Sequence, residues 1–367
     1  MNATSKSAKE LERKEKFRCM SAALDEAEKG VGHTRPNPPV GAVVVKNGRI
    51  IGRGYHAHCG EDHAEVAALK SCKVSPKGAT VYVTLEPCSK PGRVGACTDA
   101  LIAAGVKRVE WLCSDPNPTN HNCALKILRR EGIETEEWGN TCSRILNPLY
   151  WRGVDLLRPF AKVMMTGLPF VTVKIAMSLD GKICDDKGNA RWVSSELSRY
   201  KTARLRETAD CVLVGAETIR RDNPSLLCHT KDNPDLYRVV ITHSGNLPKD
   251  AQIFTDEAKD RTMVIQLTKG QPLRDAMMLL VAKGFQNILC EGGLNLARGL
   301  ADEDLVDKWL TVLCPIVIGS KPITKPFEFG RLFESDIPCE QDKDFVPRDL
   351  ILEAKYPRHK KSSQYYV

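Results

Sequence analysis

A histidine, a glutamate and two cysteines restrict this chain to few folds. His63 and Glu65 are separated by one residue, Cys88 follows a proline, and eight residues separate Cys88 from Cys97. A catalytic zinc ion takes nitrogen and sulfur ligands from three side chains and keeps its fourth position for water. His63, Cys88 and Cys97 therefore predict a Zn²⁺ site, which requires a fold that brings three distant segments together.

The local patterns place each proposed ligand on a loop beside a regular element. Residues 66–69 are apolar and predict a helix that begins at His63, with Asp62 as its expected N-cap. Residues 80–85 are rich in β-branched and aromatic side chains and predict a strand that delivers Cys88. A lone His-x-Glu arises by chance. Its combination with two cysteines that also lie beside predicted elements favours a functional site, because such sites lie on loops held by a rigid scaffold.

The chemistry predicted for this site is hydrolytic. Zinc lowers the pKa of a bound water towards ~7, and a glutamate that is not a ligand carries protons to the leaving group. His-x-Glu with Pro-Cys-x-x-Cys is the deaminase signature, and here the cysteine spacing is longer. We assign Glu65 as the catalytic residue and His63, Cys88 and Cys97 as metal ligands.

The length of 367 residues predicts two domains. We expect an α/β sandwich of the cytidine-deaminase type over 1–146, a connector over 147–168 and a second α/β domain over 169–367. The expected elements of the first domain are a helix over 10–29, a hairpin over 40–53 with a type I′ turn at Asn47-Gly48, strands over 79–85, 108–112 and 133–138, and helices over 63–71, 97–105 and 121–131.

The second domain places glycines where strands meet helices. Its expected elements are strands over 169–174, 211–214, 238–242, 287–290 and 308–313 and helices over 195–208 and 271–283. Gly215 and Gly292-Gly293 follow strands, but the Gly-x-Gly-x-x-Gly fingerprint is absent. A phosphate or nucleotide site at the helix N-termini and ordinary turn glycines are both consistent with this pattern.

Charge and hydropathy exclude several classes of protein. The net charge is +8, and the two termini supply most of it, so the body has no basic face for nucleic acid. No apolar run is long enough to cross a membrane. The charged N-terminus lacks a secretory signal, so we expect a cytoplasmic protein whose cysteines are thiols.

From residue 17 to 320 the chain resembles the bifunctional deaminase–reductases of riboflavin biosynthesis. The resemblance lies in Pro36-Asn37-Pro38-Pro39-Val40-Gly41, Gly54-Tyr55-His56, His63-Ala64-Glu65, Glu86-Pro87-Cys88, Asp115-Pro116-Asn117-Pro118, Lys174–Gly181, Asp222-Asn223-Pro224-Ser225-Leu226 and Glu291-Gly292-Gly293. It implies a dihydrofolate-reductase-like second domain that uses NADPH. It also implies two reactions, deamination of a phosphoribosylamino-diaminopyrimidinone and reduction of the ribosyl side chain to ribityl.

The resemblance also implies the residues that bind substrates and cofactor. The deaminase substrate contacts fall on Asn37, His56, Arg93, Asp115 and Asn117. The NADPH contacts fall on Ala176, Trp192, Thr218, Asp222, Gly293, Leu294, Asn295, Leu296 and Ala297, and the reductase substrate contacts on Lys174, Arg206, Leu226 and Glu291. The implied partner is a small phosphorylated pyrimidine, bound by a homo-oligomer, with no nucleic acid and no membrane.

Two other functions remain open on the sequence. The chain departs from the family at Lys90, Ala190 and His229, where a histidine, a serine and an arginine are usual. The departures at Ala190 and His229 lie in the second domain and favour a deaminase whose second half is a non-catalytic scaffold, whereas Lys90 lies between the two cysteine ligands and concerns substrate binding by the deaminase. A deaminase of RNA bases shares the His-x-Glu chemistry, but the long cysteine spacing and the near-neutral body argue against it.

Overall fold

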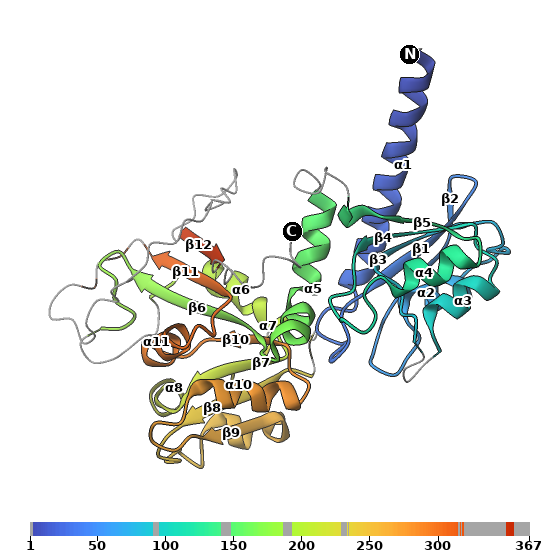
Figure 1. Ribbon diagram of the computed structural model, residues 1–367. Coiled ribbons are helices and arrows are strands. Elements are labelled where there is room, and N and C mark those ends of the chain that lie inside the picture. Colours follow the sequence, from blue (N-terminus) through green and yellow to red (C-terminus); the bar gives the residue numbers. More distant parts are fainter. Residues whose placement is uncertain are drawn as a thin grey trace. The chain divides into compact units, whose positions relative to one another are not determined.

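A computed structural model describes residues 3–90, 95–140, 148–185, 193–228, 233, 235–314, 316, 318 and 350–355. The chain divides into two compact units, Met1–Thr166 and Gly167–Val367 (Figure 1). Each unit has its own sheet. No helix in the described ranges combines the length and the apolar character that a bilayer crossing requires.

The first unit is a five-stranded sheet between two layers of helices. Its elements are α1 (Ala3–Glu28), β1 (Gly41–Lys46), β2 (Arg49–Tyr55), α2 (Ala64–Lys70), β3 (Thr80–Leu85), α3 (Cys97–Ala103), β4 (Arg108–Cys113), α4 (Cys123–Arg130), β5 (Glu134–Glu137), η1 (Trp138–Asn140) and α5 (Pro148–Thr166). The strand order is β2-β1-β3-β4-β5. β1 is antiparallel to β2 and β3, whereas β3, β4 and β5 are parallel.

The turn between β1 and β2 has the predicted conformation. Lys46 pairs with Arg49, and the two residues between them, Asn47 and Gly48, have φ of 50° and 72°. A type I′ turn requires positive φ at both central positions. The Asn-Gly prediction is therefore confirmed.

Alternation along β1 explains why both faces of this sheet are covered. Val43 and Val45 belong to a core cluster with side chains of α1 and α5, and Ala42 and Val44 belong to a second cluster with side chains of α2, α3 and α4. Successive side chains of a strand point to opposite faces. The continuous apolar run of β1 thus contributes to two cores.

Two local details differ from the sequence reading. Most of the segment expected as a connector forms α5, whose Tyr150 and Leu157 are buried in the core cluster of the first unit. The N-cap of α2 is His63 rather than Asp62, so the expected cap is wrong. The carboxylate of Asp62 instead forms an ion pair with Lys70, 2.7 Å away. It is therefore engaged on the surface and does not cap the helix.

The second unit is a seven-stranded sheet with the order β12-β11-β6-β10-β7-β8-β9. Its elements are β6 (Phe170–Ser178), α6 (Glu196–Ala203), α7 (Leu205–Thr208), β7 (Cys211–Gly215), α8 (Ala216–Asp222), β8 (Tyr237–Thr242), α9 (Gln252–Thr255), η3 (Lys259–Arg261), β9 (Thr262–Gln266), α10 (Leu273–Ala282), β10 (Asn287–Cys290), α11 (Leu294–Asp302), β11 (Lys308–Cys314) and β12 (Leu350–Lys355). β12 is antiparallel to β11, and the remaining neighbours are parallel.

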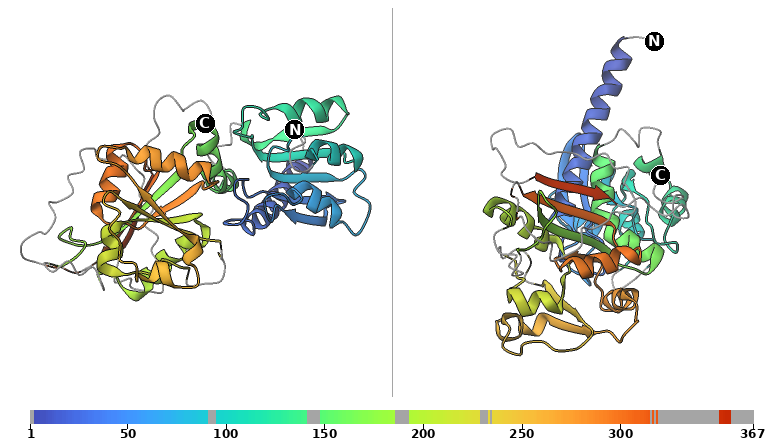
Figure 2. Two further views of the ribbon diagram at one scale, coloured as in Figure 1. Left: turned by 90° about the horizontal axis from the view of Figure 1, so that it is seen from below. Right: turned by 90° about the vertical axis from the view of Figure 1, so that its left-hand side faces the viewer.

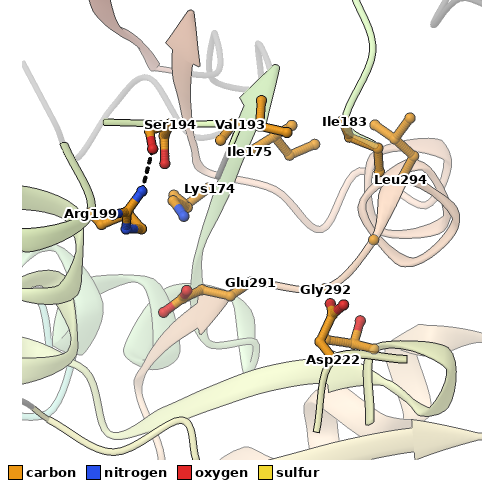
Figure 3. A pocket seen from close by; sticks show the side chains of 13 residues that line it. Lys174, Ile175, Ile183, Val193, Ser194, Arg199, Asp222, Glu291, Gly292 and Leu294 are labelled. Atoms are coloured by element: carbon orange, nitrogen blue, oxygen red, sulfur yellow. Dashed lines mark hydrogen bonds between the residues drawn. The ribbon is translucent and has the colours of Figure 1, made fainter. Parts of the chain in front are cut away.

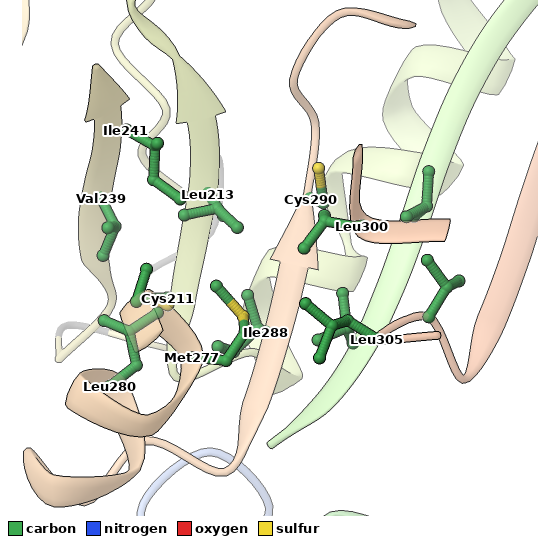
Figure 4. Packing of buried hydrophobic residues seen from close by; sticks show 14 of the residues in the cluster. Cys211, Leu213, Val239, Ile241, Met277, Leu280, Ile288, Cys290, Leu300 and Leu305 are labelled. Carbon is green, nitrogen blue, oxygen red and sulfur yellow. The ribbon is translucent and has the colours of Figure 1, made fainter. Parts of the chain in front are cut away.

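Helices cover both faces of this sheet (Figure 2). α10 and α11 pack on one face, where Met277, Leu280 and Leu300 contact strand residues such as Leu213 and Ile288 (Figure 4). α8 and α9 contribute Ile219 and Ile253 to the cluster on the other face. The five expected strands correspond to β6, β7, β8, β10 and β11. The single helix expected over 195–208 is two helices, which meet at Arg204.

A buried ion pair supports the loop that follows α8. Arg238 on β8 is fully buried and forms a bidentate pair with Asp256. It also donates to the carbonyl oxygens of Ser225, at 3.0 Å, and Ile253, at 2.9 Å. Leu226, the residue after Ser225, has a φ of 55°, which is strained for a branched side chain. Arg238 therefore stabilises a loop that includes a residue, Leu226, in an unfavourable backbone conformation.

Replacing Asp256 by asparagine should destabilise the second unit by about 2–4 kcal/mol, because it leaves a buried guanidinium without its charge partner. The Arg238 hydrogen bond lowers the pKa of Asp256. A carboxylate with a depressed pKa stabilises the fold above its unfolded pKa of roughly 3.9 and loses that effect as the pH falls. Urea unfolding should show the full difference at neutral pH and a shrinking one below about pH 4.

Asp260 lies nearby, is exposed, and provides the matched control as Asp260→Asn. If Asp260→Asn lost as much stability as Asp256→Asn, the Arg238–Asp256 pair would not explain the effect. The same holds if the loss in Asp256→Asn did not change as the pH falls below about 4.

Candidate functional sites

His63, Cys88 and Cys97 converge in the first unit, as the sequence predicts. The Nδ1 atom of His63 lies 3.2 Å from the Sγ atom of Cys97 and 3.4 Å from that of Cys88, and the two Sγ atoms are 3.2 Å apart. His63 is the residue before α2, Cys88 follows β3, and Cys97 begins α3. Three elements thus direct one donor atom each to a common point.

This donor set fits a zinc ion. Zinc bonds of about 2.0–2.3 Å at tetrahedral angles separate neighbouring donors by roughly 3.5–3.8 Å, so these three atoms need to move apart by only a few tenths of an ångström. Hydrogen bonding with Cys97 and His63 holds the pKa of Cys88 well below the ordinary value of a thiol. The thiolate is the form that binds a metal. Among the described residues, this is the cluster that meets the geometry of a metal site.

Glu65 lies in the first turn of α2, next to the three donors. Its side chain is 3% exposed. Burial raises the pKa of Glu65 to about 7. A carboxyl group with a pKa near the working pH can both take and return a proton.

His56 and Asn37 form a second polar pair beside His63. The Nδ1 atom of His56 is 3.0 Å from the carbonyl oxygen of Asp62, and its Nε2 atom is 3.0 Å from the side-chain nitrogen of Asn37. A carbonyl only accepts, so Nδ1 carries the proton and Nε2 accepts from the amide. Burial lowers the pKa of His56, in agreement with this neutral form. Its ring lies edge-on to that of His63, with centroids 5.3 Å apart.

Asp115 and Asn117 lie on the loop after β4. Asn120 joins this loop to the one after β3, which carries Cys88. Asp115 accepts from the backbone nitrogen of Asn117 and from the side chain of Asn120, both at 2.8 Å. Asn120 in turn accepts from the backbone and the hydroxyl of Ser89, at 2.9 and 2.8 Å. Buried Glu86 accepts from the backbone nitrogen of Asp115 at 3.3 Å. The two loops therefore form one hydrogen-bonded unit.

The second unit contains a pocket of about 510 Å³ at the carboxyl ends of β6, β7 and β10 (Figure 3). Its polar and charged lining residues are Lys174, Ser194, Arg199, Thr218, Asp222 and Glu291, and the others are Ile175, Ala176, Ile183, Val193, Gly292, Gly293 and Leu294. Ligands bind at this edge of parallel sheets.

The start of α11 provides a close approach of backbone to the pocket. A Cβ atom on Gly292 would lie 2.8 Å from the side chain of Leu296 and 3.3 Å from the backbone nitrogen of Gly215, so only glycine fits there without displacement. Gly293 is the N-cap of α11, and a helix N-terminus attracts phosphate groups. The glycine pair thus suits a phosphorylated cofactor such as NADPH.

Arg206 and Glu291 bind each other. The guanidinium of Arg206 donates to the two carboxylate oxygens of Glu291 at 2.7 and 3.1 Å and to the carbonyl oxygen of Leu227 at 2.8 Å. Both side chains are nearly buried, with 12% and 13% exposed. Glu291 lines the pocket and Arg206 stands behind it.

Two family models match the chain in the order of the two units. The cytidine and deoxycytidylate deaminase zinc-binding region matches residues 13–113, and the RibD C-terminal domain matches residues 169–334. The riboflavin biosynthesis protein RibD of Bacillus amyloliquefaciens is 34% identical over 322 residues, which cover 82% of this chain and 84% of that protein. The chain belongs to the RibD family.

Further RibD proteins agree in sequence and in structure. RibD of Escherichia coli K12 is 34% identical over 82% of this chain and 88% of its own. A deaminase/reductase from Thermotoga maritima superposes with a TM-score of 0.80 at 30% identity, over 94% of this chain and 99% of that one. RibD of Acinetobacter baumannii superposes with a TM-score of 0.79 at 29% identity over the same shares. The two-domain α/β fold expected from the resemblance, with a cytidine-deaminase-like and a RibD reductase part, is confirmed.

The structure of this chain brings together many, but not all, of the residues named from the sequence. Lys174, Ala176, Thr218, Asp222, Glu291, Gly293 and Leu294 line the pocket. In the described part of the chain Arg206, Leu226, Asn295, Leu296 and Ala297 do not line it, and Ala297 is buried in the core. Arg93, Trp192, Ala190 and His229 lie outside the described residues.

Sequence reasoning missed residues whose importance depends on distant contacts. Asn120 was not distinguished from other loop polar residues, although its hydrogen bonds join two loops of the first site. Arg199 resembles a solvent-facing helical arginine in sequence, yet it lines the pocket of the second unit. In the sequence, only the Asp115-Pro116-Asn117-Pro118 motif indicates that the loop carrying Asn120 belongs to a functional site.

Replacing Cys97 by serine should remove most of the zinc from the purified protein, because a buried neutral hydroxyl is a far poorer zinc ligand than a thiolate. Metal analysis after exhaustive dialysis measures the zinc content per chain. Cys72 provides the matched control, since its thiol instead hydrogen-bonds the carbonyl oxygen of Ala68 at 3.4 Å. Full zinc occupancy in Cys97→Ser would remove Cys97 from the ligand set.

Proposed function

We propose that this chain catalyses the two reactions for which the Thermotoga maritima relative is named. It would deaminate diaminohydroxyphosphoribosylaminopyrimidine and then reduce 5-amino-6-(5-phosphoribosylamino)uracil, the ribosyl side chain becoming ribityl. The observation that carries the proposal is the pairing of two sites in one chain. The first unit holds a zinc-type donor set beside Glu65, and the second holds a pocket with Lys174, Asp222 and Glu291.

The deamination uses a zinc ion held by His63, Cys88 and Cys97. When bound, zinc activates a water by lowering its pKa towards ~7. Glu65 would take a proton from that water and return it to the amino group that leaves as ammonia. Its burial raises the pKa of the carboxyl group to about 7, so the ionised group has enough proton affinity to take the proton and hold it until the return step.

The remaining polar residues of this site would hold the pyrimidine. The hydrogen bond from the Asp62 carbonyl fixes the tautomer of His56, and His56 fixes the amide of Asn37. Asp115 and Asn117 are held on a common loop. We assign these four residues, together with Arg93, to substrate binding. Rigid hydrogen-bonded side chains reduce the entropy lost when the substrate binds.

The reduction would use NADPH, which would supply a hydride to the aldehyde or imine carbon of the opened ribose. Ala176, Thr218, Asp222 and the start of α11 would hold the cofactor along the glycine side of the pocket. Trp192 is assigned to the same group. Lys174 and Glu291 would bind the reacting end of the substrate, with Arg206 keeping the carboxylate of Glu291 in place.

A deaminase with a non-catalytic second half is the weaker reading. The pocket keeps Lys174, Asp222 and Glu291 on its wall, and a scaffold would have no need of a lined pocket of this size. The RNA-base alternative has no observation in its favour. We further propose that the enzyme is a cytoplasmic homo-oligomer that takes free small molecules. The net charge of +8 lies mostly at the termini, which is in keeping with small-molecule substrates, and the described cysteines are free thiols, as in a reducing compartment.

Replacing Glu65 by glutamine should reduce deamination by about 10²–10⁴-fold, the usual worth of general acid–base catalysis. Zinc content and NADPH oxidation should be unchanged, since the substitution preserves shape and lies in the other unit. Ammonia release measures the first activity. The control is Glu61→Gln, an exposed carboxylate four residues earlier. Wild-type ammonia release by Glu65→Gln would show that another group moves the proton.

The purified protein should oxidise NADPH when it is given the deaminated intermediate, and the ribityl product should accumulate. Absorbance at the NADPH band follows the reaction and mass spectrometry identifies the product. Intact deamination with no oxidation of NADPH would support the deaminase-only reading and overturn the bifunctional one.

A further inference from the structure

The side chain of Asn120 is buried between two loops of the first unit, with 6% of the residue exposed. Its amide oxygen lies 2.9 Å from the backbone nitrogen and 2.8 Å from the hydroxyl of Ser89. Its amide nitrogen lies 2.8 Å from a carboxylate oxygen of Asp115 and 3.4 Å from the carbonyl oxygen of Pro87. Pro87 and Ser89 are the two neighbours of Cys88 in the chain. One amide therefore contacts both sides of a proposed metal ligand and a carboxylate on the other loop.

The chemistry of these partners fixes the direction in which the amide of Asn120 points. A backbone N–H only donates, whereas a carbonyl oxygen and a carboxylate only accept. The oxygen of Asn120 must therefore face Ser89, and its nitrogen must face Asp115. A reversed amide would set N–H against N–H on one side and oxygen against oxygen on the other. The bonds to Ser89 thus direct an N–H donor at Asp115 before any substrate arrives.

Asp115 is held at its backbone and at its side chain by different groups. Glu86 accepts from the backbone nitrogen of Asp115 at 3.3 Å and so places its main chain. One carboxylate oxygen accepts from the backbone nitrogen of Asn117, and the other accepts from Asn120. The bond from Asn117 stays within one loop, whereas the bond from Asn120 continues to Ser89 on the other loop. The orientation of the carboxylate is therefore set in part from the loop that carries the metal ligand.

We propose that Asn120 is a positioning residue of the deaminase, which holds the carboxylate of Asp115 in the orientation that binds the pyrimidine. This inference rests on the proposed function, which assigns Asp115 to substrate binding. The role requires no contact between Asn120 and the substrate. A side chain that is already fixed loses less entropy when its ligand binds. Loss of the Asn120 bond should therefore weaken substrate binding more than it slows the chemical step.

Asn120→Ala tests this role through the separation of KM from kcat. The KM for the pyrimidine should rise about 10- to 100-fold, the loss expected when a hydrogen bond to a charged group is removed. The kcat of deamination should stay within about threefold, because the affected contact serves binding. Zinc content per chain should be unchanged, since all three donor side chains remain. A purely structural role would lower kcat or zinc content as well.

The same substitution in an Asp115→Ala background tests whether Asn120 acts through Asp115. Asp115→Ala should lower kcat/KM by itself. Adding Asn120→Ala should then lower it by less than about threefold further, because the carboxylate that Asn120 holds is gone. Substitutions that act independently would multiply their effects instead. A full additional loss in the double variant would therefore overturn the proposal.

Asn47 provides the control, because it is exposed in the turn between β1 and β2 and has a φ of 50°. Asn47→Ala should destabilise the same unit, since alanine tolerates positive φ less well than asparagine. It should leave KM and kcat unchanged. A rise in KM as large as that of Asn120→Ala would attribute the effect to lost stability. A wild-type KM in Asn120→Ala, or loss of its zinc, would also overturn the proposal.

Binding to a Glu65→Gln background separates this inference from the proposed function. This protein should bind diaminohydroxyphosphoribosylaminopyrimidine with little turnover, and calorimetry should show binding at least tenfold weaker when Asn120→Ala is added. That result, combined with no ammonia release from the wild type, would overturn the deaminase function and leave the positioning role standing. Equal binding with and without Asn120→Ala would overturn the positioning role alone. No binding by either protein would overturn both.

Discussion

Parallel pairing between neighbouring strands is the constraint on which both sites depend. Parallel strands end at the same edge of a sheet, and their crossover helices begin there. In the first unit, β3 and β4 are parallel, so the loop with Cys88 and the loop with Asp115 lie side by side. In the second unit the same geometry brings together the ends of β6, β7 and β10. Without that shared edge, residues far apart in sequence would not meet.

Hydrogen bonds then convert adjacent loops into rigid sites. Asn120 and Glu86 join the two loops of the first unit, and the Arg206–Glu291 and Arg238–Asp256 pairs support the loop after α8 in the second. These polar groups are buried, so breaking one contact leaves a partner unsatisfied at a cost of about 1–3 kcal/mol. Asn120, Glu86 and Arg238 thus support the sites without being assigned to the substrate themselves.

The elements of the fold were largely predictable because their signals are local. The Asn47-Gly48 turn follows from the dihedral angles those residues tolerate, and the predicted strands all form, although β9 and β12 were not predicted. α5 was missed since its segment contains Pro159 and was read as a connector, whereas packing on the first core stabilises it as a helix. The break between α6 and α7 at Arg204 was also invisible, because both halves share one helical pattern.

The amino-acid sequence by itself determined the metal chemistry and the class of enzyme. The spacing of His63, Cys88 and Cys97 limits the ligand set, and side-chain chemistry limits what such a set can bind. Only the tertiary structure decided which charges face a ligand. Arg199 and Arg206 are alike in sequence, yet one lines a pocket and the other is neutralised by Glu291. That difference depends on a contact across 85 residues, and no local pattern records what a side chain meets at such a separation.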